Sequence, residues 1–520
     1  MAVMRPIADR GGLSLLRYAP SLVLLAIAVA DAGRVADTDL WGHIAFGRLF
    51  LQAGPVSHDP FNYSVPGHSW AVHEWLAELI MARTYDIGGI LGLKLWKFAC
   101  TALTIILLAM AAAETGATPL LQAAVLIATA VALMPMMQFR PQLYTYMFLA
   151  ALLALLAREN YRRDAPLWLA IPMFGLWANL HGGFVVGIGS LALYAGVTAI
   201  ADIAGGYGIR SAARVLVITV ACALATLVNP YGLRAWTHVL SALHNPITRK
   251  EMVDWQPLIS VIANSHGPHS GIFFFLLVVG IMTLSAIAFV VTPHGGDLAL
   301  VAIAVAMGAG AFDVVRNIPL AIIAAAAPLT RHLHLIATKL SGSDTAVPRI
   351  KPDRLSWRGQ AVLIAASLIL IVENRGLLSP RIPAAMDYPV GAIAFMRSHQ
   401  LHGNVLARFE WGQYLIFHLG PPSRIFVDGR VDLVYPPEVI EEYLDFFTGR
   451  PHGARILEDY ANDYVLMPSG SPADATMKSR SDWRPIYRDG VAVLFAPANS
   501  PAAHLPGVPI IATAPPSAFP

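Results

Sequence analysis

Charged residues are scarce in this sequence. Asp, Glu, Lys and Arg make up 13% of the 520 residues, whereas hydrophobic residues make up 56%. Soluble globular proteins carry roughly 25% charged residues, so this deficit excludes a purely soluble protein and places most of the chain in lipid. The formal net charge is only +3, and Lys and Arg are too scattered to form the concentrated basic face that nucleic-acid binding needs. Nucleic acid is therefore excluded as a partner.

Cysteine and phosphate-binding glycine motifs are also lacking. The two cysteines, Cys100 and Cys222, both lie in apolar runs, and they provide neither a disulfide framework nor a thiolate metal site. The chain has no glycine-rich loop of the kind that cradles phosphates. An enzyme driven by ATP or a nucleotide sugar consequently has no support in the sequence.

Long apolar runs are abundant. A helix that crosses a hydrocarbon core of roughly 30 Å needs about 20 residues, and stretches of about this length lie near 14–33, 90–113, 119–137, 142–157, 166–180, 183–204, 213–229, 271–292, 297–315, 318–332 and 359–374. They predict a polytopic α-helical membrane protein with about eleven spans. We assign residues 1–375 to the transmembrane domain, with a first outer loop at 34–89. Residues 376–497 are a C-terminal extracytoplasmic α/β domain, and the Pro/Ala-rich residues 498–520 are disordered.

The distribution of basic residues predicts the orientation. Every second loop is basic, as shown by Arg5, Arg10 and Arg17, by Arg158, Arg162 and Arg163, by Arg210 and Arg214, and by Lys339, Arg349, Lys351, Arg354 and Arg358. The positive-inside rule places these loops and the N-terminus in the cytoplasm and the tail outside. The triplet Ala28-Val29-Ala30 has the form of a signal-peptidase site, but its apolar run is longer than a usual signal-peptide core, which favours an uncleaved span.

Polar residues gather in the loops predicted to lie outside. Since polar groups are expensive at membrane depth, this asymmetry indicates a site that opens outward. Each residue taken alone is more often a helix cap or an anchor. Candidates for substrate binding are His43, His73, Arg140, Gln142, Asn179, His181, Arg316 and Asn317.

The first outer loop opens with an Asp-x-Asp pair, Asp37 and Asp39. In an extended segment the two carboxylates face the same way, and they either share a divalent cation, Mg²⁺ or Mn²⁺, or provide a general base. Glu74 is the reserve candidate for the base. Apolar stripes at 40–51 and 72–80 predict two amphipathic helices in this loop, lying on the outer leaflet.

Arg140 and Arg316 are flanked by apolar spans. A guanidinium group in such a place commonly binds phosphate or carboxylate through two hydrogen bonds. The alternative is a buried ion pair with Asp37, Glu74 or Asp313.

Several motifs together resemble a known superfamily. They are D-T-D-L-W (37–41), G-R (47–48), D-P-F (59–61), H-E-W (73–75), R-P-Q (140–142), W-A-N-L-H-G-G (177–183), R-I-F-V-D-G-R (424–430) and Y-P (435–436). Their order resembles that in bacterial multi-span proteins similar to GT-C glycosyltransferases, the superfamily of oligosaccharyltransferases, protein O-mannosyltransferases and lipid A aminoarabinose transferases. Two features depart from it: the mannosyltransferases carry Asp-Glu in place of Asp-x-Asp, and the tail lacks the W-W-D-Y-G motif of the oligosaccharyltransferases.

The resemblance implies an inverting enzyme in the bacterial inner membrane. It would transfer a sugar from a polyprenyl-phosphate-type lipid donor to an extracytoplasmic acceptor. Asp37 or Asp39 would deprotonate or orient the acceptor, while Arg140 or Arg316, together with His181, would hold the donor phosphate.

The tail reads as alternating strands and a helix. Strands are predicted at 404–409, 414–419, 424–427, 464–467 and 491–495, with a helix at 437–447. Asp428-Gly429-Arg430, at the end of a strand, is interpreted as a turn.

Two other functions remain open on the sequence. A secondary transporter or flippase for a lipid or an anionic solute predicts charged residues at mid-span and inverted repeats, whereas the charged groups here lie at the outer ends of the spans. A non-catalytic partner in polysaccharide assembly is the third hypothesis.

Overall fold

The computed structural model describes residues 19–30, 37–206, 208–242, 249–250, 252–264, 270–292, 296–341, 354–373, 388–431 and 434–505. By their contacts the residues divide into two compact units. Unit 1 consists of residues 1–34, 91–232 and 249–379, and unit 2 of residues 35–90, 233–248 and 380–520.

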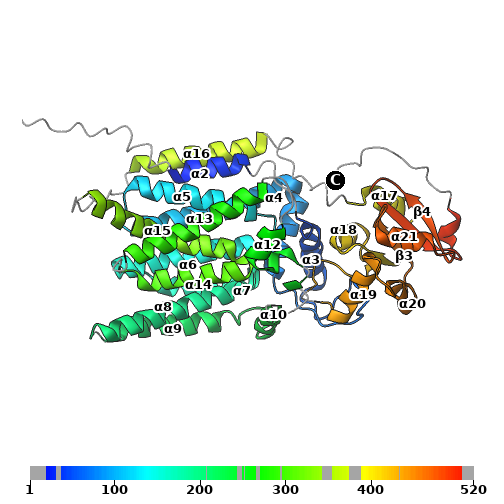
Figure 1. Ribbon diagram of the computed structural model, residues 1–520, viewed down its shortest axis with the longest axis horizontal. Coiled ribbons are helices and arrows are strands. Elements are labelled where there is room, and N and C mark those ends of the chain that lie inside the picture. Colours follow the sequence, from blue (N-terminus) through cyan, green and yellow to red (C-terminus); the bar gives the residue numbers. More distant parts are fainter. Residues whose placement is uncertain are drawn as a thin grey trace, which may run out of the picture. The chain divides into compact units, whose positions relative to one another are not determined.

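Unit 1 is built from helices (Figure 1). They are α2 (Ala19–Ala30), the part of α4 (Trp75–Glu114) from Leu91 onward, α5 (Pro119–Leu133), α6 (Gln142–Arg162), α7 (Ala170–Leu180), α8 (Phe184–Ala204), α9 (Arg210–Ala225), α12 (Leu258–Asn264), α13 (Ser270–Val291), α14 (Leu298–Asp313), α15 (Ile318–Ser341) and α16 (Arg354–Glu373). Short 3-10 turns lie at η3 (Met134–Met136), η4 (Leu167–Leu169), η5 (Val253–Trp255) and η6 (Val315–Asn317).

Helix α15 lies in the core of unit 1. Its residues from Ile318 to Thr330 are all buried, because α5, α6, α13 and α14 pack around it. Helix α2 packs against α16, and α8 packs against α9 (Figure 1). A helix that is apolar on all sides is typical of the interior of a large helical protein or of a membrane span.

A helix coincides with every apolar stretch predicted from the sequence. Within the described residues, four helical segments have the length and composition needed to cross a membrane: Trp75–Glu114, Pro119–Met136, Phe184–Ala204 and Val315–Ser341. Shorter apolar helices are Leu167–Leu180, Phe275–Val291, Leu298–Asp313 and Ile364–Glu373. The chain is therefore a mostly helical protein with several apolar helices, and the count of about eleven spans stays a prediction.

The boundary between the units falls within α4. Gly89, at φ 56° and ψ −143°, breaks the helix into two parts, and unit 2 ends at Ile90. A positive φ combined with a ψ this far from the left-handed helical region is adopted without strain essentially by glycine alone. The predicted span at 90–113 begins directly after this break.

Unit 2 combines the first loop with the tail. The loop contributes α3 (Leu40–Ala53) and the start of α4, and residues 233–248 contribute α10 (Arg234–Ala242). The tail contains α17 (Val390–Ser398), β1 (Asn404–Ala407), α18 (Phe409–Leu419), β2 (Arg424–Ile425), α19 (Pro437–Phe447), η8 (Gly453–Arg455), α20 (Ile456–Asp459), β3 (Tyr464–Pro468), α21 (Pro472–Lys478), β4 (Trp483–Arg488), β5 (Ala492–Pro497) and η9 (Pro501–His504).

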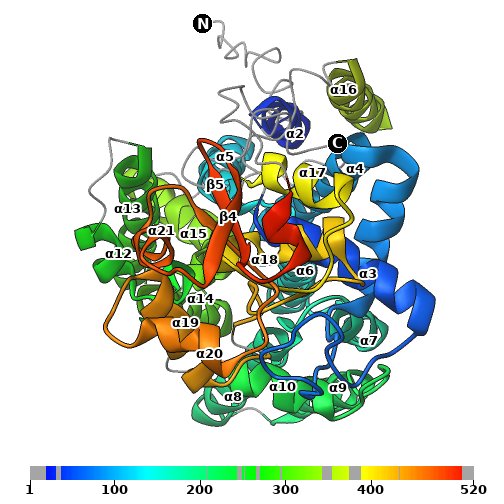
Figure 2. The same cartoon turned by 90° about the vertical axis from the view of Figure 1, so that its right-hand side faces the viewer.

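The tail folds around one small sheet. Its strand order is β2-β1-β3-β5-β4. β1 pairs in parallel with β2 and β3, whereas β5 pairs antiparallel with β3 and β4. Figure 2 shows β4 and β5 with α19 and α21 nearby. The sheet and its helices confirm the predicted α/β character of the tail.

Two details of the predicted tail are wrong. Residues 414–419 belong to helix α18 instead of a strand, because the buried Trp411, Tyr414 and Leu415 recur at helical spacing, and a short apolar run does not distinguish helix from strand by itself. Strand β4 was not predicted. Within the predicted disordered segment, η9 packs against β4 and β5, and residues 506–520 lie outside the described residues.

The amphipathic helices predicted in the first loop are present as α3 and the start of α4. The prediction assigns this loop, 34–89, to the transmembrane domain, but its contacts place it with the tail in unit 2. Helix α3 packs against α18. The loop and the tail therefore form one folded body.

Candidate functional site

The two aspartates of the first loop have different surroundings. Asp37 Oδ1 accepts a hydrogen bond from the backbone N–H of Asp39 at 2.8 Å, so the segment forms a turn and is not extended. Asp39 is the N-cap residue of α3, yet its side chain makes no capping hydrogen bond. The Asp37 carboxylate consequently holds the turn, whereas the Asp39 carboxylate is not used to cap the helix.

The Asp39 carboxylate lies against the tail. A Cβ atom added at Gly429 would collide with Asp39 Oδ1 and would lie 2.9 Å from Gln413 Nε2. Burial and then the charges of Asp37 and Asp39 raise the pKa of the Tyr388 phenol. The carboxylate that sequence reasoning favours as the base thus lies beside residues of the tail.

One turn into α3, a histidine meets the start of α4. His43 Nδ1 lies 3.0 Å from Glu78 Oε1, and His73 Nε2 lies 3.4 Å from Glu74 Oε1. Burial lowers the pKa of His43, but the hydrogen bond to Glu78 and the charges of Glu78, Glu74 and Asp39 outweigh it, so the net pKa is raised. This cluster therefore stabilises positive charge.

The His73 ring has a second neighbour from a distant segment. The ring of His238 on α10 lies 4.9 Å from it, centroid to centroid. Burial and the neighbouring His73 lower the pKa of His238 to about 3, which keeps this imidazole neutral at physiological pH.

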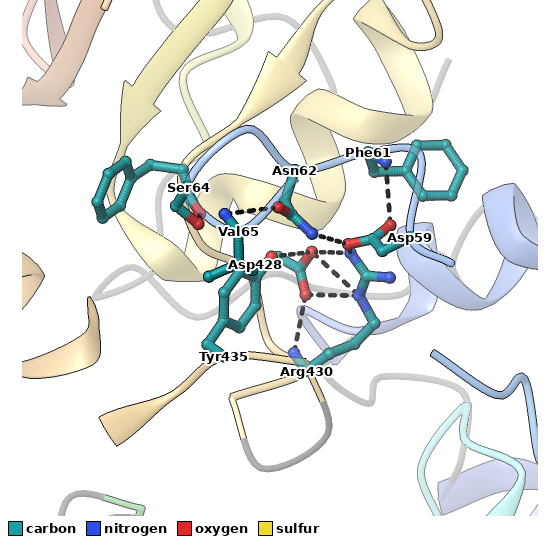
Figure 3. Close-up of polar contacts among 9 residues, drawn as sticks. Asp59, Phe61, Asn62, Ser64, Val65, Asp428, Arg430 and Tyr435 are labelled. Carbon is teal, nitrogen blue, oxygen red and sulfur yellow. Dashed lines mark hydrogen bonds and ion pairs between the residues drawn. The ribbon is translucent and has the colours of Figure 1, made fainter. Parts of the chain in front are cut away.

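A buried ionic network joins the loop to the tail (Figure 3). Arg430, 5% exposed, donates from Nη2 to Asp59 Oδ2 at 2.9 Å and to Asp428 Oδ2 at 2.5 Å. Tyr435 donates to Asp428 at 3.0 Å, and Asn62 donates to Asp59 at 2.5 Å. Residues 428–430, which were predicted to form a turn, thus bind the first loop through Arg430 and Asp428. We call this network of Asp59, Asn62, Asp428, Arg430 and Tyr435 the clamp.

Aromatic rings and backbone pairing complete the clamp. The guanidinium of Arg430 lies over the rings of Trp70, Phe46 and Phe61, at 4.4, 4.6 and 5.8 Å from their centroids. Ile425 of β2 donates to Phe61 O at 2.9 Å and accepts from Tyr63 N at 3.2 Å. The loop therefore adds a short extended segment to the edge of the sheet, which is why the R-I-F-V-D-G-R segment lies beside D-P-F.

A separate basic group lies in unit 1 near the start of α6. Arg316 is over the Trp255 ring at 5.3 Å, and Gln142, with its side-chain oxygen turned toward it, accepts from Arg316 Nε and Nη2 at 2.5 and 2.6 Å. Arg140 Nη1 lies 3.5 Å from Asp254 Oδ2. The predicted candidates Arg140, Gln142 and Arg316 thus occupy one neighbourhood.

One ion pair of these arginines lies within unit 1. Arg140 pairs with Asp254, which is 58% exposed and was not among the predicted partners, whereas a pairing with Asp37 or Glu74 stays a prediction. Asp313 instead pairs with Arg249 at 2.6 Å. In the described part of the chain, Arg316 has no carboxylate within ion-pair distance and is held by the amide and the ring given above.

Sequence reasoning missed two lysines near this group. Lys94 and Lys97 on α4 are 8% and 2% exposed, and Lys97 Nζ lies over the ring of Phe139 at 4.7 Å. Phe139 directly precedes Arg140. The sequence could have indicated them, because two lysines within the otherwise apolar predicted span at 90–113 are energetically costly and therefore suggest a function.

The other predicted candidates of unit 1 make internal hydrogen bonds. Asn179 donates to the carbonyls of Gly175 and Val228 at 2.7 and 2.8 Å, and Asn317 donates to Gly310 O at 3.1 Å. His181 Nδ1 accepts from the N–H of Gly183 at 2.9 Å, which assigns the proton of the neutral ring to Nε2. The amides thus connect backbone segments, and the Nδ1 atom of His181 is held by the loop at Gly183.

Comparisons with known proteins place this fold. No family model and no curated protein matches the sequence. Among solved structures, the chain is similar to the arabinofuranosyltransferase AftD from Mycobacteria, with a TM-score of 0.53 and 14% identity over 94% of this chain and 40% of that one. The chain therefore spans less than half the length of AftD.

Two further structures are similar. The Archaeoglobus fulgidus oligosaccharyltransferase tethered to an acceptor peptide has a TM-score of 0.55 and 11% identity over 88% of this chain and 69% of that one. ArnT from Cupriavidus metallidurans bound to undecaprenyl phosphate has a TM-score of 0.51 and 14% identity over 94% of this chain and 98% of that one. The resemblance to GT-C glycosyltransferases is confirmed at the level of the fold.

Proposed function

We propose that the protein is a membrane glycosyltransferase that moves a sugar from a polyprenyl-phosphate-type donor to an extracytoplasmic acceptor, with inversion at the sugar carbon. The observation that carries the proposal is the fold, which it shares with three transferases. The undecaprenyl phosphate in ArnT and the acceptor peptide in the oligosaccharyltransferase support a lipid-linked donor and an acceptor outside the membrane.

Asp39 is proposed as the general base, which takes the proton of the acceptor nucleophile while the nucleophile attacks the sugar carbon. Its side chain does not cap α3, whereas Asp37 holds the turn. Glu74 remains the reserve for this role, and His43 and His73 are proposed to contact the acceptor. A Mg²⁺ or Mn²⁺ ion shared by Asp37 and Asp39 remains part of the proposal, since carboxylate oxygens suit these ions.

The basic group of unit 1 is proposed to hold the donor phosphate. Arg140 and Arg316 provide planar donor forks that match phosphate oxygens, and Lys97 adds a buried positive charge. The leaving phosphate gains charge as the glycosidic bond breaks, so fixed cations stabilise the transition state more than the ground state. Gln142 and His181 are proposed to orient these groups.

The proposed location is the bacterial inner membrane, with a cytoplasmic N-terminus and the tail outside. The apolar helices and the membrane-embedded transferases of the same fold support it. The sidedness follows from the basic loops.

The test compares Asp39→Asn with Asp37→Asn in a strain that lacks the chromosomal copy. A positioned base typically contributes 10²–10⁴-fold to the rate, so Asp39→Asn is expected to abolish sugar transfer at wild-type protein level, while polyprenyl-linked sugar accumulates in the lipid extract. Asp37→Asn is expected to act by loosening the turn and to retain part of the activity. Full complementation by Asp39→Asn would remove the base from the proposal, and an unchanged pool of lipid-linked sugar in the deletion strain would favour a transport function.

A further inference from the structure

Three side chains of unit 2 are arranged as a ligand set. His43 comes from α3, Glu78 from the first turn of α4, and Glu74 directly precedes that helix. One ligand atom of each lies within 4.8 Å of the other two. Glu74 and Glu78 are four residues apart, so they lie on one face of the chain as it enters the helix.

Glu78 also carries an unsatisfied oxygen. The residue is 4% exposed, its Oε1 faces His43 Nδ1 at 3.0 Å, and its Oε2 is buried without a hydrogen-bond partner. A buried acceptor left unpaired costs about 1–3 kcal/mol, and more when it is charged. A cation bound in the cluster would satisfy this oxygen.

The surroundings of the cluster favour a cation as well. Asp39 lies one helical turn before His43 and adds its charge to the field at the imidazole. Next to Glu74, the paired rings of His73 and His238 provide further nitrogen atoms, and His238 Nε2 is buried without a partner.

We propose that His43, Glu74 and Glu78 bind a divalent first-row transition metal, with Zn²⁺ as the preferred ion. One imidazole with two carboxylates is a donor set that zinc accepts in a four-coordinate site, leaving a position for water or for a nearby histidine. Mg²⁺ and Ca²⁺ prefer oxygen ligands alone. The bound ion would join α3 to the start of α4 and so fix the helix that Asp39 precedes.

This site uses residues other than Asp37 and Asp39. Its existence does not depend on sugar transfer, because metal binding is measured without any substrate. A failure of the glycosyltransferase proposal would therefore leave this inference intact. Likewise, absence of zinc binding would leave the glycosyltransferase proposal intact.

The experiment uses the full chain purified in detergent, stripped with a chelator and titrated with Zn²⁺. Metal content by mass spectrometry and melting temperature are the two readouts. The wild type is expected to bind one zinc ion per chain and to melt at a higher temperature with it. Glu78→Gln and His43→Gln are expected to weaken binding by at least about 10-fold and to abolish the shift in melting temperature.

The exposed His402 and Glu441 of the tail provide matched controls, His402→Gln and Glu441→Gln, which are expected to bind zinc as the wild type does. If Glu78→Gln does not fold, Glu74→Gln decides the question. Unchanged zinc affinity in the folded variants overturns the site. Mg²⁺ binding that equals zinc binding and is likewise lost in Glu78→Gln overturns the assigned class of metal. Loss of zinc in Asp37→Asn and Asp39→Asn, with retention in Glu78→Gln, would instead place the ion at the Asp-x-Asp pair.

Discussion

Gly429→Ala tests whether the tail positions the proposed base. Gly429 lies where an added Cβ would collide with Asp39 Oδ1 and would stand 2.9 Å from Gln413 Nε2. The carboxylate must then move by about 1 Å, and a misplacement of this size costs roughly 10²-fold in rate. Because side chains can relax, the loss of stability is expected to be only about 1 kcal/mol.

The assay measures initial rates of sugar transfer by the purified full chain, together with its melting temperature. Gly490→Ala is the matched control, since an added Cβ there meets nothing within 4 Å. A wild-type rate in Gly429→Ala would refute the positioning of Asp39 by the tail, provided that Asp39→Asn is inactive. A wild-type rate in both Gly429→Ala and Asp39→Asn would refute the catalytic role of Asp39 itself.

Three further predictions concern the other parts of the molecule. Arg316→Lys and Arg140→Lys keep the charge but lose the planar fork, so we expect the KM for the lipid donor to rise about 10-fold or more. Arg249→Lys is the control and should leave this KM unchanged, because its partner Asp313 is exposed. A wild-type KM in both Arg316→Lys and Arg140→Lys would support a purely structural role. Asp428→Asn removes one partner of a buried network and should cost about 3–5 kcal/mol, seen as faster hydrogen exchange at the amides of Ile425 and Tyr63, while protection equal to wild type would contradict the clamp. Phosphatase fusions at Pro66 and Gly470 should be active, and a bright fluorescent-protein fusion at Gly470 would reverse the proposed orientation.

The candidate site was predictable in part. Asp39, His43, Glu74, Arg140 and Arg316 stand out because polar groups beside apolar spans are costly and therefore rarely arbitrary. Sequence position alone could not show that Asp37 Oδ1 accepts a hydrogen bond from the backbone of Asp39, since an Asp-x-Asp pair reads alike in a turn and in an extended segment. Nor could it show that Asn179 and Asn317 bond to carbonyls of their own unit.

Local chemistry determined the positions of the helices in unit 1. An apolar run of sufficient length must satisfy its backbone internally in lipid, and a helix does so within one segment; this is why the predicted stretches coincide with helices. Helix α19 at Pro437–Phe447 follows from its own sequence in the same way, because its apolar residues recur at helical spacing.

Tertiary structure alone decided the partnership of the first loop and the tail. Arg430 and Asp59 are separated by 371 positions, yet their side chains share one buried network, and Gly429 lies against Asp39. Such contacts depend on which surfaces pack together and exclude water. The hydrophobic periodicity within either segment does not indicate which other segment it will pack against. The sequence by itself determined the helices, the polar loops between them and the sheet-forming tail, whereas the grouping of His43 with Glu78 and of Asp39 with Gly429 arose only when the chain packed.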